Sequence, residues 1–515
     1  MPPTLTPEQL ALREARRLKK LASQNASTSD RVSLNPHAKI LKREWARLRA
    51  PQSPSSSVRV MTWNMLAQTL VRRDLFPSSD CLRATQRGLM LSNEITSYDP
   101  DIACLQEVDA ERSDELALEL EKKGYQCTYG TGLGKRHGCM VAHRTSKFKR
   151  LTERVISLDS ICLVDISTMT SSSTLNHVSN ESTSKGLTRK TKNIALIVAL
   201  STHDQGLIPK GYIAVTCHLF WHPRYVYERA RQGAIIRREV LDFQKKNNLL
   251  RWPVFFAGDF NCQPTEALYN LLVRNPLTAR HAKDISASHV IHMSIDPSIQ
   301  PSSASTEKGG EEEGEEGAAA ISDAQDRGGE NAEGKEKEEP DPDRVFTNTR
   351  NALPEDGLMS AEELEKIFWS FPPLRSAYDE GHDKIFGLGV TSGSLDLERT
   401  FAARLDEKDK LQYLGRKGMN EPMYTNFTHY WRLTLDYIFI QDPLIAFPAD
   451  LNTPNLPLSN NDHASSQALG IARPKGEGEI IALLRTHRAE DLEPGLPKLG
   501  VCASDHIALC AEIEY

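Results

Sequence analysis

The sequence predicts an α/β fold whose β-sheets are covered on both faces. Nine short apolar segments have the length and composition of buried strands, and helical patterns lie between several of them. These segments are too uniformly apolar for sheets with one face in water. A third observation is compositional: 39% of the 515 residues are hydrophobic, below the usual roughly 45–50%. Part of the chain is therefore expected to lie outside the packed core.

The predicted strands run from Val58 almost to the C-terminus. They cover residues 58–66, 102–108, 139–143, 194–200, 213–219, 254–259, 435–440, 480–484 and 507–513. The helical patterns between them cover residues 84–97, 114–122 and 225–246. Ser360 and Glu363 have the spacing of a capping box and predict a further helix start. With no internal repeat and no leucine-rich array, we expect one catalytic domain over residues 58–515.

The residues before Val58 are expected to form a basic N-terminal helix and a flexible linker. Residues 1–50 carry 11 Lys and Arg against 4 Asp and Glu, and Thr6-Pro7 is a typical helix start. This arm is either a solvated tail or a weak nucleic-acid contact.

Three segments inside the domain are expected to be disordered insertions, at about 168–190, 298–344 and 452–478. Each has too few large apolar side chains to offset the entropy of ordering. Residues 307–344 carry 15 Asp and Glu against 5 Lys and Arg. We expect this acidic stretch to lie away from the site or to act as a weak gate, so that its deletion changes kcat by a few-fold at most.

Several classes of protein are excluded. No apolar run approaches the ~18–20 residues of a transmembrane helix, and charges stand where a signal peptide has its apolar stretch. Nine scattered cysteines without a CxxC pair indicate reduced thiols, in an intracellular protein of the cytoplasm or nucleus, and not a zinc site. The net charge of −6 leaves a polyanionic substrate open, because steering depends on the local field of a cleft.

Polar residues stand at the ends of the predicted strands. Taken singly, each is more often a turn or helix cap than a functional group. As a set they are informative, because α/β sheets gather ligand groups where strand ends meet. The set comprises Asn64, Glu107, His218, Asp259, Asn261, Asp436, Asp505 and His506.

The oxygen donors of this set favour a hard divalent cation. Glu107 and Asp505 are anionic ligands, and Asn64 and Asn261 are neutral ones. Such donors suit Mg²⁺, with Mn²⁺ able to substitute, whereas zinc would favour more Cys and His.

The other members suit hydrolysis of a phosphodiester. Asp259, steadied by Asn261, is the candidate to orient or deprotonate the attacking water. Asp436 would fix the tautomer of His506 and favour its cation. His218 and His506 would then stabilise the charge that gathers on the phosphoryl oxygens.

The order and spacing of six sequence blocks resemble the endonuclease/exonuclease/phosphatase superfamily. Within it, they look like the deadenylase–nocturnin branch, and most like fungal Ngl-type RNA exonucleases. The resemblance covers about residues 58–275 and 360–515. The blocks are WNMLAQ, CLQEVD, CHLFWHP, GDFN, TLDYIFI and SDH.

The resemblance implies a four-layer α/β sandwich of the DNase I-like type, with two mixed sheets packed face to face and helices outside. It implies a site at one edge of the sandwich, where Asn64, Glu107 and Asp505 match metal positions. Asp259 and Asn261 match the water-activating pair. His218 matches the phosphate-binding histidine, and Asp436 with His506 matches the orienting dyad.

The same resemblance implies a Mg²⁺-dependent 3′→5′ exonuclease that acts on the 3′ end of single-stranded RNA and releases 5′-mononucleotides. Pro223 and Trp431 fall where deadenylase relatives hold a base. Trp431 is alternatively a core or rim aromatic. Arg229 either reaches the site or solvates its helix. It also stays open which residue contacts phosphate among Lys135, Arg136 and His137.

Two alternatives remain. One is a nucleotide or dinucleotide phosphatase of the nocturnin type, and the other is a catalytically inactive RNA-binding protein on the same fold. A lipid phosphatase fits the blocks less well.

Ribosomal-RNA trimming and poly(A) shortening both stay open, as do the protein partners. The missing leucine-rich array argues against assembly into a deadenylase complex through that module.

Overall fold

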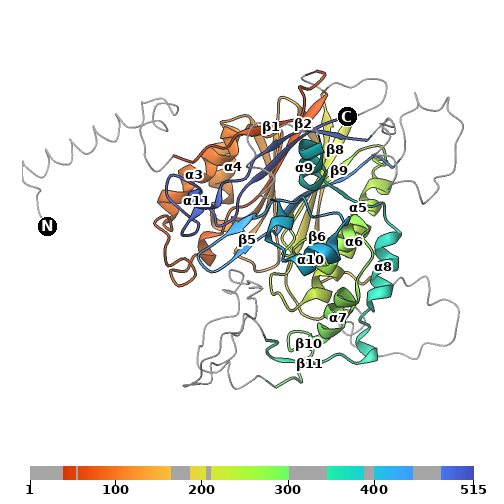
Figure 1. Ribbon diagram of the computed structural model, residues 1–515. Coiled ribbons are helices and arrows are strands. Elements are labelled where there is room, and N and C mark those ends of the chain that lie inside the picture. The colour runs from red at the N-terminus through yellow and green to blue at the C-terminus, as the bar shows by residue number, and fades with distance from the viewer. Residues whose placement is uncertain are drawn as a thin grey trace, which may run out of the picture.

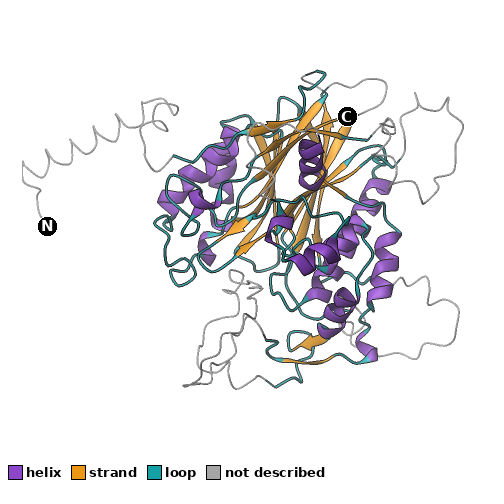
Figure 2. Cartoon of the chain, in the orientation of Figure 1, coloured by secondary structure: helices purple, strands orange, loops and turns teal. Residues whose placement is uncertain are grey.

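The protein is a sandwich of two mixed β-sheets packed face to face, with helices on both outer surfaces (Figure 1). The computed structural model describes residues 39–53, 56–163, 186–203, 210–300, 345–387, 400–444 and 477–515. In Figure 2 the strands form the centre of the molecule and the helices lie outside them. The predicted four-layer α/β architecture is therefore confirmed.

The first sheet has seven strands in the order β1-β16-β17-β2-β3-β5-β4. Strands β2 and β3 are parallel, and β17 is antiparallel to β2. The C-terminal ends of β2 and β3 thus share an edge with the N-terminal end of β17. The strands are β1 (Trp45–Arg47), β2 (Ser57–Asn64), β3 (Ile102–Asp109), β4 (Tyr125–Thr131), β5 (His137–Arg144), β16 (Glu479–Leu484) and β17 (Leu509–Glu514).

The second sheet has six strands in the order β12-β15-β9-β8-β7-β6. Strands β8 and β9 are parallel, and β15 is antiparallel to β9, with Asp436 opposite Asp259. The strands are β6 (Phe148–Ser157), β7 (Ile194–Thr202), β8 (Gly211–Cys217), β9 (Val254–Asp259), β12 (Arg375–Ser376) and β15 (Asp436–Gln441). Two short ribbons pair β10 (Val290–His292) with β11 (Thr349–Asn351), and β13 (Asn426–Phe427) with β14 (Arg432–Leu433).

The helices cover the outer faces of the two sheets (Figure 1). On the seven-stranded sheet lie α3 (Ala84–Ser97), α4 (Ser113–Glu121) and α11 (Ala489–Leu492). The six-stranded sheet carries α5 (Val226–Lys246), α6 (Ala267–Val273), α7 (Ala279–Ala287) and α8 (Ala361–Trp369). The other helices are α9 (Ala377–Gly387), α10 (Glu407–Tyr413) and the 3-10 helices Gln68–Leu70, Ala110–Arg112, Pro354–Asp356 and Phe401–Arg404.

Alternation along the strands explains the layers. Val58 and Val60 of β2 point into the core between the sheets, whereas Met61 and Trp63 pack under the helices. In β7, Leu196 and Val198 face the other sheet, and Ile197 faces α5. Both faces of each central strand are therefore buried, as the apolar segments predicted.

All nine predicted strands are present, with ends shifted by at most two residues, and so are the three helices. The predicted helix start is also confirmed, because the Ser360 hydroxyl accepts a hydrogen bond from the Glu363 backbone N–H at the start of α8.

The folded region begins earlier than predicted, which corrects the boundary at residue 58. Trp45–Arg47 of the expected linker forms β1 and pairs with β16. Arg43 is buried and donates to the Ala508 carbonyl at 2.7 Å and to the Glu94 carboxylate. The expected basic helix lies outside the described residues.

The three expected insertions fall mostly outside the described residues as well. At the described end of the first insertion, Leu187 and Thr188 are buried, and the Thr188 hydroxyl donates to the Glu228 carboxylate at 2.8 Å. Gly478 donates its backbone N–H to Asp442.

The nine cysteines are free thiols. Within the described chain, no helix has both the length and the apolar character needed to span a bilayer.

Candidate active site

The predicted polar residues meet where the ends of the two sheets lie against each other. In the seven-stranded sheet, Asn64 ends β2 next to Gln106 of β3, and His506 lies just before β17. In the six-stranded sheet, Asp259 ends β9 opposite Asp436. The parallel and antiparallel pairings described above bring these positions to one edge.

Asn64 connects the two sheets through its carboxamide. Its Nδ2 donates to Glu107 Oε1 at 2.7 Å and to Asp259 Oδ2 at 3.0 Å. Its Oδ1 accepts from the Leu66 backbone N–H at 3.0 Å. Asn64 thus bridges two carboxylates through its Nδ2. Its oxygen points to the loop after β2.

Glu107 is aimed into the site by an irregularity in its own strand. The register of β3 against β5 shifts between Leu105 and Val108, and Glu107 has a φ of +53°. A bulge of this kind re-aims a side chain, and a positive φ is costly for a residue with a Cβ. The Glu107 carboxylate also accepts from the Ala67 backbone N–H at 2.9 Å. Burial raises the pKa of Glu107, and Asp505 raises it further against the opposing effect of His137.

Asp436, His506 and Asp259 form a carboxylate–imidazole–carboxylate row. His506 Nδ1 lies 2.8 Å from Asp436 Oδ2, and His506 Nε2 lies 3.7 Å from Asp259 Oδ2. Burial alone would lower the pKa of His506, but Asp436, Asp505 and Asp259 together raise it well above its ordinary value. Burial and Asp436 raise the pKa of Asp259 to about 7, against the opposing effect of His506. The row therefore holds a cationic imidazole beside a carboxylate that can gain or lose a proton near neutrality.

His218 and Asn261 border Asp259 on its other sides. His218 lies between two carboxylates, with Nε2 3.7 Å from Asp259 Oδ2 and Nδ1 3.8 Å from Glu107 Oε1. The Asn261 backbone N–H donates to Asp259 Oδ1 at 2.9 Å, and its Nδ2 donates to the Leu219 carbonyl. Asn261 thereby ties Asp259 to the loop that follows His218.

Asp505 completes the acidic side of the site. Its Oδ2 accepts from Asn426 Nδ2 at 3.1 Å, and its backbone carbonyl accepts from the Phe427 N–H at 2.9 Å. In the part of the chain that the structure describes, Asp505 and Glu107 form no ion pair with Lys or Arg.

The donor set fits a divalent cation. Glu107, Asp259, Asp436 and Asp505 are all at most 7% exposed, and the described residues offer them only His218 and His506 as ion-pair partners. Buried carboxylates in such excess need a counter-ion. Asp436 Oδ1 is buried without a hydrogen-bond partner, and one ligand atom each from Asp259, Asp436 and His506 lie within 4.8 Å of one another.

Pro223 and Trp431 lie on loops next to the site. Pro223 is in the loop after His218, and its carbonyl accepts from Arg229 Nη2 at 2.9 Å. Trp431 is half-buried against the apolar cluster that includes Leu66 and Phe76 in the segment after Asn64. Trp431 is thus a rim aromatic beside the end of β2.

Arg229 neither reaches the site nor solvates its helix. It is 1% exposed, and Nη1 donates to the His222 carbonyl at 2.5 Å while Nη2 also contacts Glu266 at 3.1 Å. Arg229 therefore fixes the loop after His218 from inside the protein.

Residues 135–137 differ in where their side chains lie relative to the site. Lys135 Nζ donates to Asn193 Oδ1 at 2.7 Å, and Arg136 is exposed. His137 is the member beside the site, because its charge affects Glu107 and its ring centroid lies 6.4 Å from that of His218.

Arg87 is a residue that sequence reasoning missed. It is 2% exposed on α3, and its guanidinium donates to the carbonyls of Met65, Leu66 and Ala503 at 2.5–2.7 Å. These carbonyls belong to the loops next to Asn64 and Asp505, so Arg87 fastens the two loops together. Because it lies inside a helix pattern and not at a strand end, only the folded structure reveals it.

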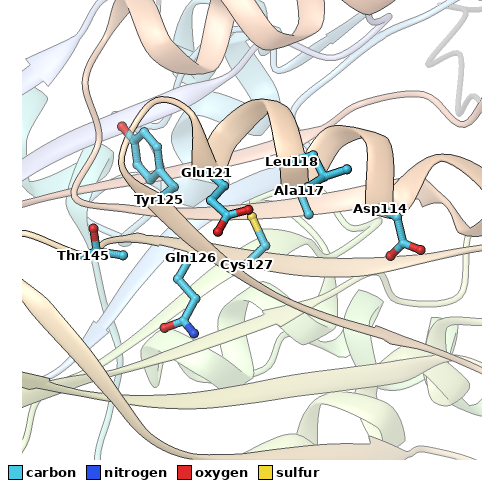
Figure 3. Close-up of a pocket in the computed structure, with 8 residues that line it drawn as sticks. All are labelled: Asp114, Ala117, Leu118, Glu121, Tyr125, Gln126, Cys127 and Thr145. Atoms are coloured by element: carbon cyan, nitrogen blue, oxygen red, sulfur yellow. The ribbon is translucent and has the colours of Figure 1, made fainter.

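Two hollows of the described surface differ in how they relate to the site. A hollow of about 720 Å³ lies along α4 and β4, with Leu118 and Glu121 on the helix side and Cys127 on the strand side (Figure 3). No candidate residue lines it. A smaller cavity of about 220 Å³ between α3 and α4 is bordered by Arg87 and Glu107.

The comparisons with known proteins support the Ngl-type resemblance. A protein of Schizosaccharomyces pombe named as a probable RNA exonuclease is 27% identical over 527 residues, covering 100% of this chain and 89% of its own. The RNA exonuclease NGL2 of Saccharomyces cerevisiae is 26% identical over 544 residues, covering 99% and 89%. The crystal structure of ANGEL2, titled a 2′,3′-cyclic phosphatase, is 17% identical with a TM-score of 0.48, covering 92% and 98%. Residues 61–356 match the model of the Endonuclease/Exonuclease/phosphatase family, and the chain belongs to this family.

Proposed function

We propose that this protein is a Mg²⁺-dependent 3′→5′ exonuclease that hydrolyses single-stranded RNA from its 3′ end and releases 5′-mononucleotides. The observation that carries the proposal is the buried cluster in which Asn64 spaces Glu107 from Asp259 while His506 lies between Asp259 and Asp436. The Ngl-type relatives, named as RNA exonucleases, support RNA as the substrate.

Glu107 and Asp505 would hold the cation, with Asn64 and Asn261 as nearby amides, and the cation would neutralise charge on the phosphodiester. Mn²⁺, a similar oxygen-binding ion, substitutes for Mg²⁺ in this proposal.

Asp259 accepts the proton of the attacking water. Its Oδ1 is fixed by the Asn261 N–H, so Oδ2 is the atom that faces His218, His506 and the substrate. The water oxygen bonds to phosphorus, the P–O3′ bond breaks, and the shortened RNA leaves as a 3′ alcohol after its 3′ oxygen takes a proton from solvent.

His218 and His506 stabilise the charge that develops on the phosphoryl oxygens. Asp436 holds His506 through Nδ1, which leaves Nε2 directed toward Asp259 and the phosphate. Pro223 and Trp431 hold the terminal base, with the half-buried Trp431 ring as a stacking surface.

The deciding experiment uses 5′-labelled oligo(A), oligo(U) and a mixed-sequence RNA, each with Mg²⁺, with Mn²⁺ and with EDTA. We expect a ladder that shortens from the 3′ end and requires the cation. Loss of label as a single short product, or equal degradation in EDTA, contradicts the proposal. The relative rates on the three RNAs give the base preference.

A second candidate function is a phosphatase acting on a small nucleotide, because the buried acidic cluster suits hydrolysis of other phosphate esters as well. Competition between single-stranded RNA and a 2′-phosphorylated dinucleotide distinguishes the two activities. An inactive RNA-binding role is tested with Glu107→Gln, which at limiting Mg²⁺ should abolish turnover and retain RNA binding. A Glu107→Gln protein that degrades RNA as fast as the parent contradicts the site assignment.

A further inference from the structure

The loop after β8 and Phe346, which lies shortly before β11, form a group of aromatic rings that the chemistry above does not use. The rings of His222 and Phe346 are nearly parallel, with centroids 6.3 Å apart and planes 8° apart. The edge of Tyr225 meets both, at 5.0 and 5.1 Å between centroids. Trp221 lies 5.1 Å from His222. We call Trp221, His222 and Phe346 the aromatic platform.

The platform is supported from below and accessible at its margin. Phe220, Tyr225 and Val290 form a buried cluster on which Trp221 and Phe346 pack. Trp221 and Phe346 themselves are half-buried. Ring surface that is held in place but still partly exposed is suited to stacking against a planar ligand.

Two arginines lie against the same rings. The guanidinium carbon of Arg224 lies 5.4 Å from the Phe346 centroid, and that of Arg189 lies 5.6 Å from the Phe220 centroid. Arg224 is exposed and Arg189 is half-buried. Among the described residues, neither is recorded in an ion pair with a carboxylate, although Arg224 affects Asp284 electrostatically. The surface therefore combines aromatic faces with positive charge.

The platform lies close to the catalytic cluster. His222 is four residues after His218, a separation of at most about 14 Å of extended chain. Arg229 holds the intervening loop through the carbonyls of His222 and Pro223. Burial, reinforced by nearby arginines, lowers the pKa of His222 to about 4, so its ring is neutral at physiological pH.

We propose that the aromatic platform, with Arg224 and Arg189, binds the nucleotides of a single-stranded RNA that lie 5′ of the scissile bond. A base stacks on Phe346 or Trp221, and the arginines contact the adjacent phosphates. The inference rests on the proposed function. It extends the substrate-binding surface beyond the terminal base to nucleotides that do not react. An acidic peptide would match the arginines but would gain nothing from the planar rings.

The test measures equilibrium binding of fluorescein-labelled oligo(A) of 12 and of 3 nucleotides to full-length protein carrying Glu107→Gln. On that background, Phe346→Leu retains apolar volume but removes the ring, and Arg224→Gln removes the charge. Because stacking and cation contacts are each of order 1 kcal/mol or more, we expect each change to weaken 12-mer binding by about five- to tenfold. The 3-mer, which is too short to span both regions, should lose less than twofold.

Arg144→Gln is the matched control. The guanidinium carbon of Arg144 lies 4.4 Å from the centroid of the Tyr125 ring, so this arginine also contacts an aromatic face. Arg144 is at the opposite end of β5 from His137, about 23 Å away along the strand. It should leave 12-mer binding unchanged. Thermal denaturation of every variant checks that the fold is retained.

Three outcomes overturn the proposal. In the first, Phe346→Leu and Arg224→Gln bind the 12-mer as tightly as the parent. In the second, only Arg224→Gln has an effect, which indicates charge attraction without stacking. In the third, the 3-mer and 12-mer lose equal affinity, which indicates damage to the site itself. Failure of the proposed function is recognised separately, because the unsubstituted protein would then not shorten RNA.

Discussion

The two sheets contribute different chemistry to one site. Glu107 of the seven-stranded sheet has both carboxylate oxygens fixed, by Asn64 and by the Ala67 N–H. In the six-stranded sheet, Asp436 has an oxygen without a partner and Asp259 has a pKa raised by burial and by Asp436 to about 7. The six-stranded sheet therefore supplies the carboxylate that can exchange a proton near neutrality, Asp259, whereas the seven-stranded side supplies Glu107, whose pKa burial and Asp505 also raise, and the imidazole of His506.

Two hydrogen bonds join these halves, Asn64 to Asp259 and His506 to Asp436. Neither sheet alone holds a complete site. The function therefore depends on how the two sheets pack, and substitutions can separate the contributions of the two halves.

The largest effect is expected from the two central carboxylates. Asp259→Asn removes the proton acceptor and should lower kcat by about 10²–10⁴-fold with an unchanged half-saturating Mg²⁺ concentration. Glu107→Gln should instead raise that concentration at least about tenfold, since it removes an anionic ligand. Mg²⁺ titrations of RNA hydrolysis check both. Equal Mg²⁺ dependence in the two variants would contradict the division between the sheets.

Asp436→Asn tests the bond between His506 and the six-stranded sheet. Without the Asp436 charge the pKa of His506 should fall, because Asp436 is the main group that raises it against burial. We expect kcat to drop by about 10²-fold and the alkaline limb of the pH–rate profile to move to lower pH. A profile of unchanged shape would show that the cationic form of His506 is not required.

Arg87→Lys tests the support of the seven-stranded half. Lysine keeps a charge but cannot reach the Met65, Leu66 and Ala503 carbonyls together. Leaving buried carbonyls without a donor should reduce the free energy of unfolding by about 2 kcal/mol. Urea denaturation measures the loss, and Arg72→Lys, at an exposed arginine, is the surface control. If stability is unchanged but the half-saturating Mg²⁺ concentration rises, Arg87 acts on ligand placement alone.

The smallest effect is expected in the pH dependence of stability in EDTA. The folded pKa of Asp259, about 7, lies above its ordinary value of 3.8. The stability that Asp259 contributes to the folded protein is therefore fully present below pH 3.8 and is lost as pH rises through 7. Asp259→Asn should gain stability relative to the parent, on the order of 1–2 kcal/mol, as pH rises from 5 to 7. A difference between the two proteins that is independent of pH contradicts the raised pKa.

The sequence was informative where a polar residue directly follows or precedes an apolar strand. Asn64, Asp259 and Asp436 stand at such ends; strand pairing brings Asp259 to Asp436, and the packing of the two sheets brings Asn64 to Asp259. What could not be predicted depends on contacts distant in sequence. Arg87 acts through carbonyls up to 416 residues away, and the bulge that aims Glu107 has no sequence signal of its own.

The sequence patterns also failed to predict two edge strands, β1 and β6. β6 alternates buried and accessible residues and carries Leu151 and Val155 on an exposed face, so it lacks the continuous apolar run of the central strands. β1 is only three residues long and arginine-rich. Its pairing with β16, and not its composition, makes it a strand.

The position of β1 has a practical consequence for anyone who shortens this protein. A fragment starting at residue 58 would lack the three residues that pair with β16 and would leave its backbone amides and carbonyls open to another molecule. Such a fragment is expected to self-associate, whereas one that keeps residues 39–57 retains a protected margin.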